Sequence, residues 1–298
     1  MASEDHKLWD VVIIGGGPAG LAAGIHLARG GYRSLLLERL RLGGQARLLG
    51  LVENYPGFPR GIQGKDLMDR WVRQGRYWGL KIRREEVREI ARHGEGFSLR
   101  LLKNARLRAK SVVFCPGAAF KKLAIPGEKR FWGRGIYHAA FDKARGLAGK
   151  TVAVVGGGEA AVHQAILLSS HAGEVYLISR EDRLKAHRLL LKRFNRRANI
   201  IWLGGTVVER ARGGKFLERI YLRHSAGGIR SFLEISALFV LIGKERTQWL
   251  GLRGPKPCGF FVAGDAAGDV FRQVAVASGD GIRAAMRCMG FLERRSLA

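Results

Sequence analysis

The chain has 298 residues, which is long for a single hydrophobic core and typical of two domains. Its hydrophobic content of 47% is ordinary for a globular protein, and the longest apolar run is too short for a membrane span. The segment from Met1 to Asp10 lacks the apolar stretch of a secretory signal. The three cysteines, Cys115, Cys258 and Cys288, give neither a disulfide framework nor metal-ligand spacing. We therefore expect a cytoplasmic protein without a metal site.

The net charge of +27 is unusually high and fits either an anionic partner or an arginine-rich surface without a particular target. Nucleic acid, an anionic membrane surface and an acidic protein all fit such a charge. Residues 183–197 hold seven Lys or Arg residues, no acid and an apolar stripe, so they predict an amphipathic helix with a cationic outer face. The sequence has no nucleic-acid recognition motif and no aromatic residues interleaved with the basic ones. Electrostatic steering of an anionic partner is the prediction that remains.

A buried strand leads directly into a glycine-rich turn near the N-terminus. Residues Val11 to Ile14 are β-branched, as is typical of a strand covered on both faces. The turn that follows has the pattern Gly-x-Gly-x-x-Gly. Its glycines permit a tight turn, close approach of a pyrophosphate, and close packing of a helix on the strand. The residues that we expect to contact a dinucleotide here are Gly15, Gly17, Pro18, Ala19 and Gly20.

A helix, a second strand and an acid complete this first pattern. Residues Leu21 to Ala28 predict a small-residue helix, whose N-terminus offers N–H groups and a positive dipole to phosphates. The strand Ser34 to Leu37 ends at Glu38, eighteen positions after Gly20, where an acid binds a ribose hydroxyl. The full order favours a bound dinucleotide over a glycine-rich loop without a ligand.

The second half of the chain repeats this arrangement. The strand Thr151 to Val155 leads into Gly-x-Gly-x-x-Ala, a helix from Val162 to Leu168 and a strand from Val175 to Ile178. Ser179 stands 23 positions after Gly156, as Glu38 stands 23 positions after Gly15. Serine followed by arginine favours the 2′-phosphate of NADPH over NADH, whereas Glu181 argues the other way. The expected contacts are Gly156, Gly158, Glu159, Ala160, Ser179 and Arg180.

The segments between and after the two turns predict a small β-meander, a linker and a C-terminal helix. A helix is expected from Gln63 to Tyr77. Strands are expected over 80–90, 97–102, 105–107 and 111–115, and a basic linker over 120–134. Near the C-terminus, a strand precedes Gly264 and Asp265, and a helix to about Phe291 contains two glycines. Because glycine weakens a helix, Gly279 and Gly281 indicate close approach of a ligand or of another helix.

These motifs together resemble one family of flavoproteins. The chain is similar over nearly its whole length to the low-molecular-weight thioredoxin reductases and to the ferredoxin–NADP reductases of thioredoxin-reductase type. The resemblance rests on Gly15-x-Gly17-x-x-Gly20 with Glu38, Gly43-Gly44-Gln45, Glu53-Asn54-Tyr55-Pro56-Gly57, Gly156-x-Gly158, Gly264-Asp265 and Arg272-Gln273.

The resemblance implies an α/β fold of two Rossmann-like, three-layer β/β/α domains. FAD would bind a discontinuous domain of residues 1–119 and 247–298, and NAD(P)H an inserted domain of residues 120–246. By the same resemblance Asp265 would hold the flavin ribityl chain, Gln273 would face the pyrimidine edge, and the backbone of Val87 would meet the adenine. Members are typically homodimeric. The other FAD contacts expected from these motifs are Gly44, Gln45, Asn54 and Arg272.

The chain departs from this family at the redox motif. Thioredoxin reductases carry Cys-x-x-Cys-Asp shortly before the second glycine-rich turn, where this chain has no cysteine in residues 137–142. A dithiol relay needs two sulfurs, so the family mechanism of thioredoxin reduction is not expected. His138 and Asp142 stand in that place and are candidates for moving protons near the flavin, against the alternative of a surface histidine and a helix-start carboxylate. The basic residues for a 2′-phosphate are reduced to Arg180, Arg183 and Lys185.

We therefore expect an FAD-dependent oxidoreductase in which hydride passes from NAD(P)H to the flavin and electrons leave directly to an external acceptor. A ferredoxin or flavodoxin, as an acidic electron carrier, is the first candidate. Three alternatives remain open: reduction of a partner's disulfide, reduction of oxygen as an NAD(P)H oxidase, and a non-catalytic flavin-binding sensor or scaffold.

Overall fold

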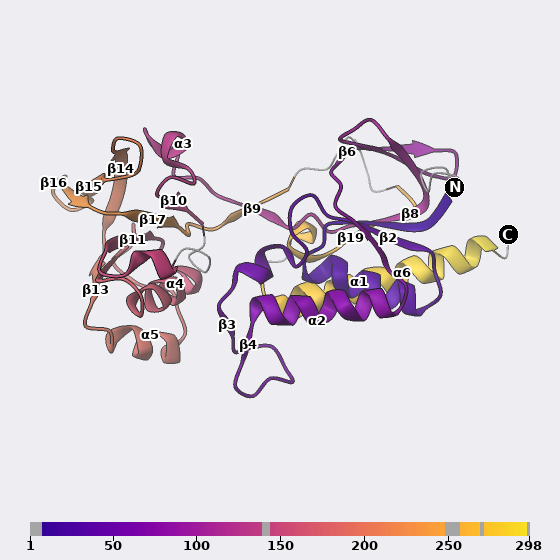
Figure 1. Cartoon of the computed structure of the whole chain (residues 1–298), viewed down its shortest axis with the longest axis horizontal. Helices are drawn as coiled ribbons and strands as arrows, with labels where there is room; N and C mark the ends of the chain where they lie inside the picture. The colour runs from indigo at the N-terminus through magenta and orange to yellow at the C-terminus, as the bar shows by residue number, and fades with distance from the viewer. Residues whose placement is uncertain (1–7, 139–143, 248–256, 269–270, 297–298) are drawn as a thin grey trace. The chain divides into compact units, whose positions relative to one another are not determined.

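The computed structural model describes residues 8–138, 144–247, 257–268 and 271–296 (Figure 1). The chain forms two compact units. Unit 1 consists of Met1–Ala118 and Arg246–Ala298, and unit 2 of Ala119–Glu245. Each boundary lies one residue before the position that the sequence predicts for it.

Unit 1 is built on a mixed sheet whose centre is parallel. Strand β1 (Leu8–Ile14) pairs in parallel with β2 (Ser34–Leu37) and with β8 (Arg106–Phe114). The carboxyl ends of these strands therefore lie at one edge, where the glycine-rich turn leaves β1. The sheet order is β5 (Lys81–Arg83), β2, β1, β8, β7 (Gly96–Leu101) and β6 (Val87–His93), with β19 (Phe260–Val262) pairing in parallel with β8.

Strand β8 corrects one sequence expectation, because residues 105–107 and 111–115 were expected to form separate strands. The structure has a single strand over Arg106–Phe114. One edge of this strand is shared, since β7 pairs with it up to Ala109 and β19 pairs with it from Val112. Its burial changes from alternating to nearly continuous along its length. That change of pattern is the reason why one strand resembles two in the sequence.

Alternate residues of β1 face two different layers. Val11 and Ile13 lie in the core under the helices, while Val12 and Ile14 lie in the core under the β-meander. Helix α1 (Pro18–Arg29) packs against both α2 (Gly64–Tyr77) and α6 (Val274–Ser296). Unit 1 is therefore the expected three-layer β/β/α arrangement. The predicted helix over 63–77 is confirmed, with Gln63 as its N-cap.

Unit 2 has the same layering around a fully parallel sheet. Val152 and Val154 face helices α4 (Glu159–Ser169) and α5 (Arg188–Asn195), whereas Ala153 and Val155 face a three-stranded antiparallel meander. The sheet order is β10 (Ile136–Tyr137), β17 (Ala237–Val240), β11 (Thr151–Val155), β12 (Glu174–Ile178) and β13 (Ile200–Leu203), and the meander is β14 (Thr206–Arg212), β15 (Arg219–His224) and β16 (Arg230–Glu234).

Helix α5 is shorter than the helix expected over 183–197. The chain before it is an extended loop, because the backbone N–H of Lys185 donates to the carbonyl of Gly157 at 2.7 Å. The helix begins after His187, whose ring accepts from the backbone N–H of Leu190. Its apolar residues Leu190 and Phe194 are buried, as the predicted amphipathic pattern requires.

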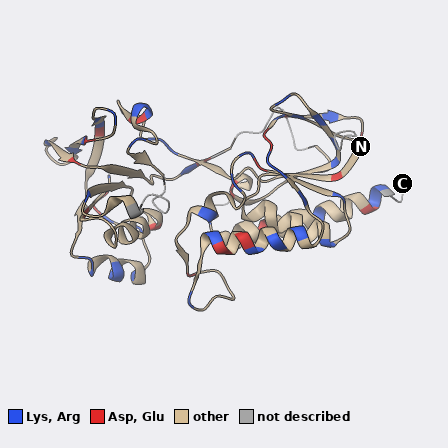
Figure 2. Cartoon of the chain, in the orientation of Figure 1, with Lys and Arg blue, Asp and Glu red and all other residues tan. Residues whose placement is uncertain are grey.

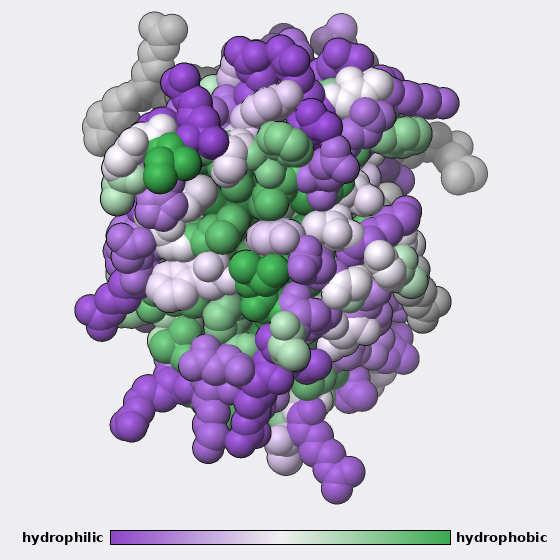
Figure 3. Space-filling view, turned by 90° about the vertical axis from the view of Figure 1, so that its left-hand side faces the viewer, coloured by the Kyte–Doolittle hydropathy of each residue, from purple (hydrophilic) through white to green (hydrophobic). Residues whose placement is uncertain are grey.

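The surface of unit 2 also carries exposed apolar side chains. Figure 3 shows the side on which Figure 1 labels β13 and β16, where apolar side chains gather in the middle of the face and hydrophilic ones surround them. The large exposed apolar residues of this unit are Trp132, Leu189, Ile201, Trp202, Phe216, Ile229 and Phe232.

The chain passes between the units twice, and the two crossing strands pair with each other. They are β9 (Ala118–Phe120) and β18 (Lys244–Arg246). The predicted linker over 120–134 contains the end of β9 and a short helix, α3 (Glu128–Phe131). The remaining short elements are η2 (Gly44–Leu48), β3 (Leu51–Val52), β4 (Ile62–Gln63), η3 (Ala144–Leu147) and η4 (Gly264–Ala267).

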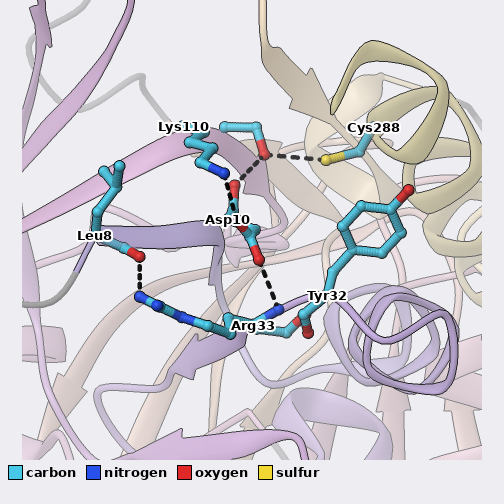
Figure 4. Close-up of polar contacts among 8 residues, drawn as sticks. Leu8, Asp10, Tyr32, Arg33, Lys110 and Cys288 are labelled. Atoms are coloured by element: carbon cyan, nitrogen blue, oxygen red, sulfur yellow. Dashed lines mark hydrogen bonds and ion pairs between the residues drawn. The ribbon is translucent and has the colours of Figure 1, made fainter. Parts of the chain in front are cut away.

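A polar cluster fixes the amino-terminal end of β1 (Figure 4). The Asp10 carboxylate accepts from the backbone N–H of Arg33 at 2.9 Å and pairs with Lys110 at 2.8 Å. Burial raises the pKa of Asp10, but the Lys110 and Arg33 contacts outweigh it, so the pKa lies below its usual value of 3.8. The Ser111 hydroxyl donates to the carbonyl of Asp10 and lies 3.1 Å from the thiol of Cys288. This cluster lies at the opposite end of β1 from the glycine-rich turn.

Candidate functional site

The first glycine-rich turn is closed at two of its glycines and open at the third. A β-carbon on Gly15, where φ is +102°, would lie 2.1 Å from the carbonyl oxygen of Cys115. A β-carbon on Gly20 would lie 1.8 Å from the carbonyl oxygen of Gly15. A β-carbon on Gly17 would meet no atom of the described chain within 4 Å. Gly17 is also the N-cap of α1 and has no side-chain capping bond. The turn thus leaves room for a phosphate at a helix N-terminus.

Glu38 lies against this turn. One carboxylate oxygen accepts from the backbone N–H of Gly16 at 2.7 Å, and the other accepts from Leu40 at 2.8 Å. A carboxylate has about four acceptor sites. Each oxygen therefore keeps one site for a ribose hydroxyl while the backbone fixes its position.

Gly43, Gly44 and Gln45 form a second loop that contacts the turn. The Gly43 N–H donates to the carbonyl of Gly16 at 2.6 Å, and a β-carbon on Gly44 would lie 3.1 Å from Cα of Gly17. The Gln45 amide N–H donates to the carbonyl of Ala118 at 2.6 Å. Its Oε1 is buried and has no hydrogen-bond partner among the described residues. Since a buried acceptor without a partner is costly, this atom fits a donor supplied by a ligand.

The C-terminal segment converges on the same turn. Gly264 has a φ of +70°, and a β-carbon there would lie 2.8 Å from Cβ of Ala19. Asp265 follows Gly264 in η4, an element that contacts α1. A β-carbon on Gly281 would lie 2.0 Å from the carbonyl oxygen of Ala19, so this glycine serves the approach of another helix. At Gly279 a β-carbon would meet no described atom within 4 Å.

Four further residues predicted to contact FAD belong to unit 1. Asn54 Nδ2 donates to Gln273 Oε1 at 3.0 Å, which joins two residues 219 positions apart. Arg272 directly precedes Gln273 and is half-buried. Val87 is buried at the start of β6, shortly after Arg83, whose carbonyl accepts from the backbone N–H of Glu38 at 3.1 Å. The segment that contains Val87 therefore approaches the acid expected to bind the ribose.

The second glycine-rich turn repeats the geometry of the first. A β-carbon on Gly156, where φ is +143°, would lie 2.3 Å from the carbonyl oxygen of Leu241, and at Gly158 the space is open. Ala161 takes the third glycine position, with its Cβ 3.0 Å from where a Gly156 β-carbon would lie. Helix α4 begins at Glu159, whose carboxylate accepts from the N–H of His187 at 3.3 Å, and Ala160 is exposed.

Ser179, at the end of β12, is already engaged within the protein. Its side chain is buried, its hydroxyl donates to the carbonyl of Glu181 at 2.8 Å, and it accepts from Trp202 Nε1 at 2.9 Å. A hydroxyl has a single hydrogen to donate. Ser179 therefore reaches a phosphate as a donor only if its bond to Glu181 breaks, whereas Arg180 is exposed.

Comparison with known proteins agrees with the two turns. Residues 9–252 match the family described as pyridine nucleotide-disulphide oxidoreductase. The chain belongs to this family. A thioredoxin reductase of Pneumocystis jirovecii is 35% identical over 304 residues, with 93% of each sequence covered. A thioredoxin reductase of Bacillus subtilis is 30% identical over 308 residues, with 97% of this chain and 96% of the relative covered.

Solved structures give the same result for the fold. The crystal structure of the thioredoxin reductase of Lactococcus lactis has a TM-score of 0.90 and 27% identity, and covers 96% of this chain and 99% of its own. The thioredoxin reductase of T. acidophilum has a TM-score of 0.88 and 26% identity, with 97% and 99% covered.

The chain is a thioredoxin reductase-like, FAD-dependent NAD(P)H oxidoreductase. The geometry of the first turn fits FAD, because the open space at Gly17, the oriented carboxylate of Glu38 and the orphaned Oε1 of Gln45 surround one cradle. The second turn has the equivalent open space at Gly158 and fits the pyridine nucleotide. When bound, FAD would accept the hydride from NAD(P)H and pass its electrons on one or two at a time.

His138 is half-buried and contacts three residues of unit 2. Its Nδ1 lies 2.8 Å from the carbonyl oxygen of Val240, and its ring lies 4.4 Å from Phe120 and 4.5 Å from Trp132 between centroids. Burial lowers the pKa of His138 more than the bond to Val240 raises it. Packing accounts for these contacts, and proton transfer by His138 stays a prediction. The other candidate, Asp142, lies outside the described residues.

The cysteines of the described chain are poorly placed for redox chemistry. Burial raises the pKa of Cys115 to about 12 and that of Cys288 to about 11. Both thiols therefore stay protonated near neutral pH, and a thiol attacks only as a thiolate. Cys258 is exposed and is a free thiol. These are the three cysteines of the sequence, and no two of them form a Cys-x-x-Cys pair.

Sequence reasoning missed several groups that shape the site. The carbonyls of Cys115 and Leu241 close the two turns, and backbone oxygens leave no signal in a residue pattern. Trp202, which binds Ser179, lies on a strand whose pairing partner is not readable from the sequence.

No helix of the described residues has the length and apolarity to cross a membrane. The described residues include no group of three or more side chains suited to hold a metal ion.

Proposed function

We propose that this protein passes electrons from NADPH through FAD directly to an external acceptor, without an internal dithiol. The cysteine arrangement carries this proposal, since two thiols are buried and protonated and the third has no partner cysteine in the sequence. A relay by dithiol exchange needs an attacking thiolate and a resolving thiol. Each NADPH gives two electrons and leaves NADP⁺ and one proton. It therefore reduces two one-electron carriers or one two-electron acceptor.

In this scheme the residues of the chain bind FAD and orient its flavin ring. The first turn and Glu38 hold the adenosine and pyrophosphate part of FAD at the N-terminus of α1. Gln45 Oε1 and the Asn54–Gln273 pair supply polar groups of fixed position, so the flavin is oriented without the rearrangement of a free side chain. Asp265, which follows Gly264 in η4, accepts from the sugar-alcohol hydroxyls.

An acidic electron-carrier protein, such as a ferredoxin or flavodoxin, is the acceptor that the charge favours. The net charge is +27, and helix α5 carries basic side chains without an acidic one (Figure 2). Its exposed residues include Arg188 and Lys192. Complementary charge raises the rate of encounter more than it raises affinity, and salt screens this effect.

Reduction of a partner's disulfide is the second candidate. The relatives from Pneumocystis jirovecii and Bacillus subtilis are named thioredoxin reductases, and that name points to a disulfide as the acceptor. An exposed disulfide of an acidic partner would meet the same cationic surface. We also propose that the protein is cytoplasmic and forms a homodimer, as the family resemblance suggests. Light scattering at several protein concentrations would measure the oligomeric state.

The test starts with anaerobic titration of the purified, FAD-loaded protein with NADPH, followed by absorbance near 450 nm. Bleaching supports an enzyme, and a flavin that stays oxidised contradicts the proposal and favours a sensor or scaffold. Turnover is then compared with ferredoxin, flavodoxin, thioredoxin and oxygen at equal concentration. Faster reduction of thioredoxin selects the second candidate, and oxygen consumption without any carrier selects an oxidase.

Salt and charge variants test the acceptor assignment. Carrier reduction should slow as ionic strength rises from about 0.02 to 0.3 M, because the Debye length falls over this range. Arg188→Gln with Lys192→Gln on α5 should raise the carrier KM several-fold. The matched control, Arg73→Gln with Arg76→Gln on α2, removes the same charge from the other unit. Equal effects of the two double variants would show that only net charge matters.

A further inference from the structure

The loop after β12 is fixed beside the second glycine-rich turn. The Lys185 N–H donates to the carbonyl of Gly157 at 2.7 Å, and residues Gly158 and Lys185 form an isolated parallel bridge. The Glu159 carboxylate accepts from the N–H of His187 further along the loop. In this fold the residues at the end of the second strand contact the adenine ribose of a dinucleotide and its 2′ substituent. Residues 179–185 therefore face that substituent from a loop with a defined conformation.

An acid stands among the basic residues of this loop. The two carboxylate oxygens of Glu181 lie 2.9 Å and 2.7 Å from Nζ of Lys185. Lys185 first, and Arg180 to a smaller extent, lower the pKa of Glu181 below its usual value. Glu181 is therefore charged at neutral pH, and both basic side chains already interact with it.

The other donors of the loop are also limited. The hydroxyl hydrogen of Ser179 is bonded to the carbonyl of Glu181. Arg180 and Arg183 are exposed, and a second acid, Asp182, lies between them in the sequence. A 2′-phosphate carries close to two negative charges and needs positive charge that is not already neutralised.

We propose that Glu181 is a specificity-determining residue that weakens binding of the 2′-phosphate and so reduces the preference of this protein for NADPH over NADH. Its carboxylate repels the phosphate and holds Lys185, while in NADH it accepts a hydrogen bond from the free 2′-hydroxyl. The inference rests on the pyridine-nucleotide role of the second turn. It is independent of the electron acceptor.

Binding of the oxidised dinucleotides tests this directly, because NADP⁺ and NAD⁺ leave the flavin unreduced. Titration calorimetry of the FAD-loaded protein would compare wild type, Glu181→Gln, Glu234→Gln and Glu181→Gln with Lys185→Gln. Glu234 is a matched control, since it is an exposed glutamate of the same unit in an ion pair with Arg219. Glu181→Gln should bind NADP⁺ about tenfold more tightly, a change typical of one partly screened charge contact. Its affinity for NAD⁺ should stay the same or fall.

The second variant separates the role of Lys185. Adding Lys185→Gln to Glu181→Gln should remove most of the gain in NADP⁺ affinity. In the single variant the freed ammonium group of Lys185 can bind the 2′-phosphate, and in the double variant that positive charge is absent. The proposal is overturned if Glu181→Gln tightens neither dinucleotide, if it tightens both equally, or if Glu234→Gln has the same effect. If the wild-type protein binds neither NADP⁺ nor NAD⁺, the nucleotide-binding role of the second turn is itself overturned. Failure with every electron acceptor would contradict the proposed function and leave these affinities unaffected.

Discussion

The open space at Gly17 predicts a variant that folds normally and loses its flavin. Gly17 has φ of −76° and ψ of −173°, which an alanine adopts without strain. A β-carbon there would meet no described atom within 4 Å. Gly17→Ala should therefore cost the apoprotein about 1 kcal/mol or less, the difference between glycine and alanine at an N-cap. The added methyl lies where the pyrophosphate approaches, so FAD affinity should fall about 10- to 100-fold, as for overpacking by about 1–3 kcal/mol.

Gly15→Ala is the matched variant in the same turn, with the opposite expectation for folding. A β-carbon there would lie 2.1 Å from the Cys115 carbonyl oxygen, in a backbone with φ of +102°. The left-handed conformation costs about 1–2 kcal/mol and the overpacking about 1–3 kcal/mol. The apoprotein should lose about 2–5 kcal/mol of its free energy of unfolding.

Two measurements separate these variants. Urea unfolding of the apoproteins, followed by far-UV circular dichroism, gives the free energy of unfolding. Quenching of FAD fluorescence on titration with apoprotein gives the affinity. Wild-type FAD affinity in Gly17→Ala would refute the assignment of this space to the pyrophosphate. A loss of apoprotein stability in Gly17→Ala equal to that of Gly15→Ala would refute the reasoning from the turn geometry.

Three further expectations concern thiols and pH. At pH 8 a disulfide reagent should modify Cys258 alone in the native protein and all three cysteines in urea. The reason is that burial raises the pKa of Cys115 to about 12 and that of Cys288 to about 11. Rapid modification of Cys288 in the native protein would contradict this prediction. Burial lowers the pKa of His138 below 6.5, so folding favours its neutral form. The free energy of unfolding should therefore fall as the pH drops below about 6.5. In the His138→Gln variant this fall should be less steep. The pKa of Asp10 lies below 3.8, so its stabilisation is present at neutral pH and lost as pH falls through the acid range. Asp10→Asn should cost about 1 kcal/mol at pH 7 and flatten that acid decline.

The repeated turns were readable from the sequence because their physics lies in the glycines themselves. Gly15 and Gly156 both have positive φ and both close against a carbonyl, as the spacing of the two patterns implies. The start of α2 at Gly64 was equally accessible, since amphipathic periodicity locates a helix in a single segment. Features that depend on one stretch of chain were therefore predicted well.

Features that depend on distant partners were not. The extent of β8 is set by β7 and β19, which lie before and far after it in the sequence. Helix α5 starts late because the Gly157 carbonyl holds Lys185 in an extended loop. The pairing of Asn54 with Gln273 joins opposite ends of the chain. Composition and spacing contain no record of such tertiary contacts.

The pairing of β9 with β18 brings the first and last residues of unit 2 within hydrogen-bonding reach, as the bond from Lys121 N–H to the Gly243 carbonyl at 3.0 Å shows. The two ends of unit 2 therefore lie next to each other, as is common for a domain inserted into another domain. A gene that joins Ala118 to Thr247 through a tight glycine-containing turn should yield a miniature protein that keeps the whole sheet of unit 1. The same adjacency makes this junction a natural place to exchange one nucleotide module for another by recombination.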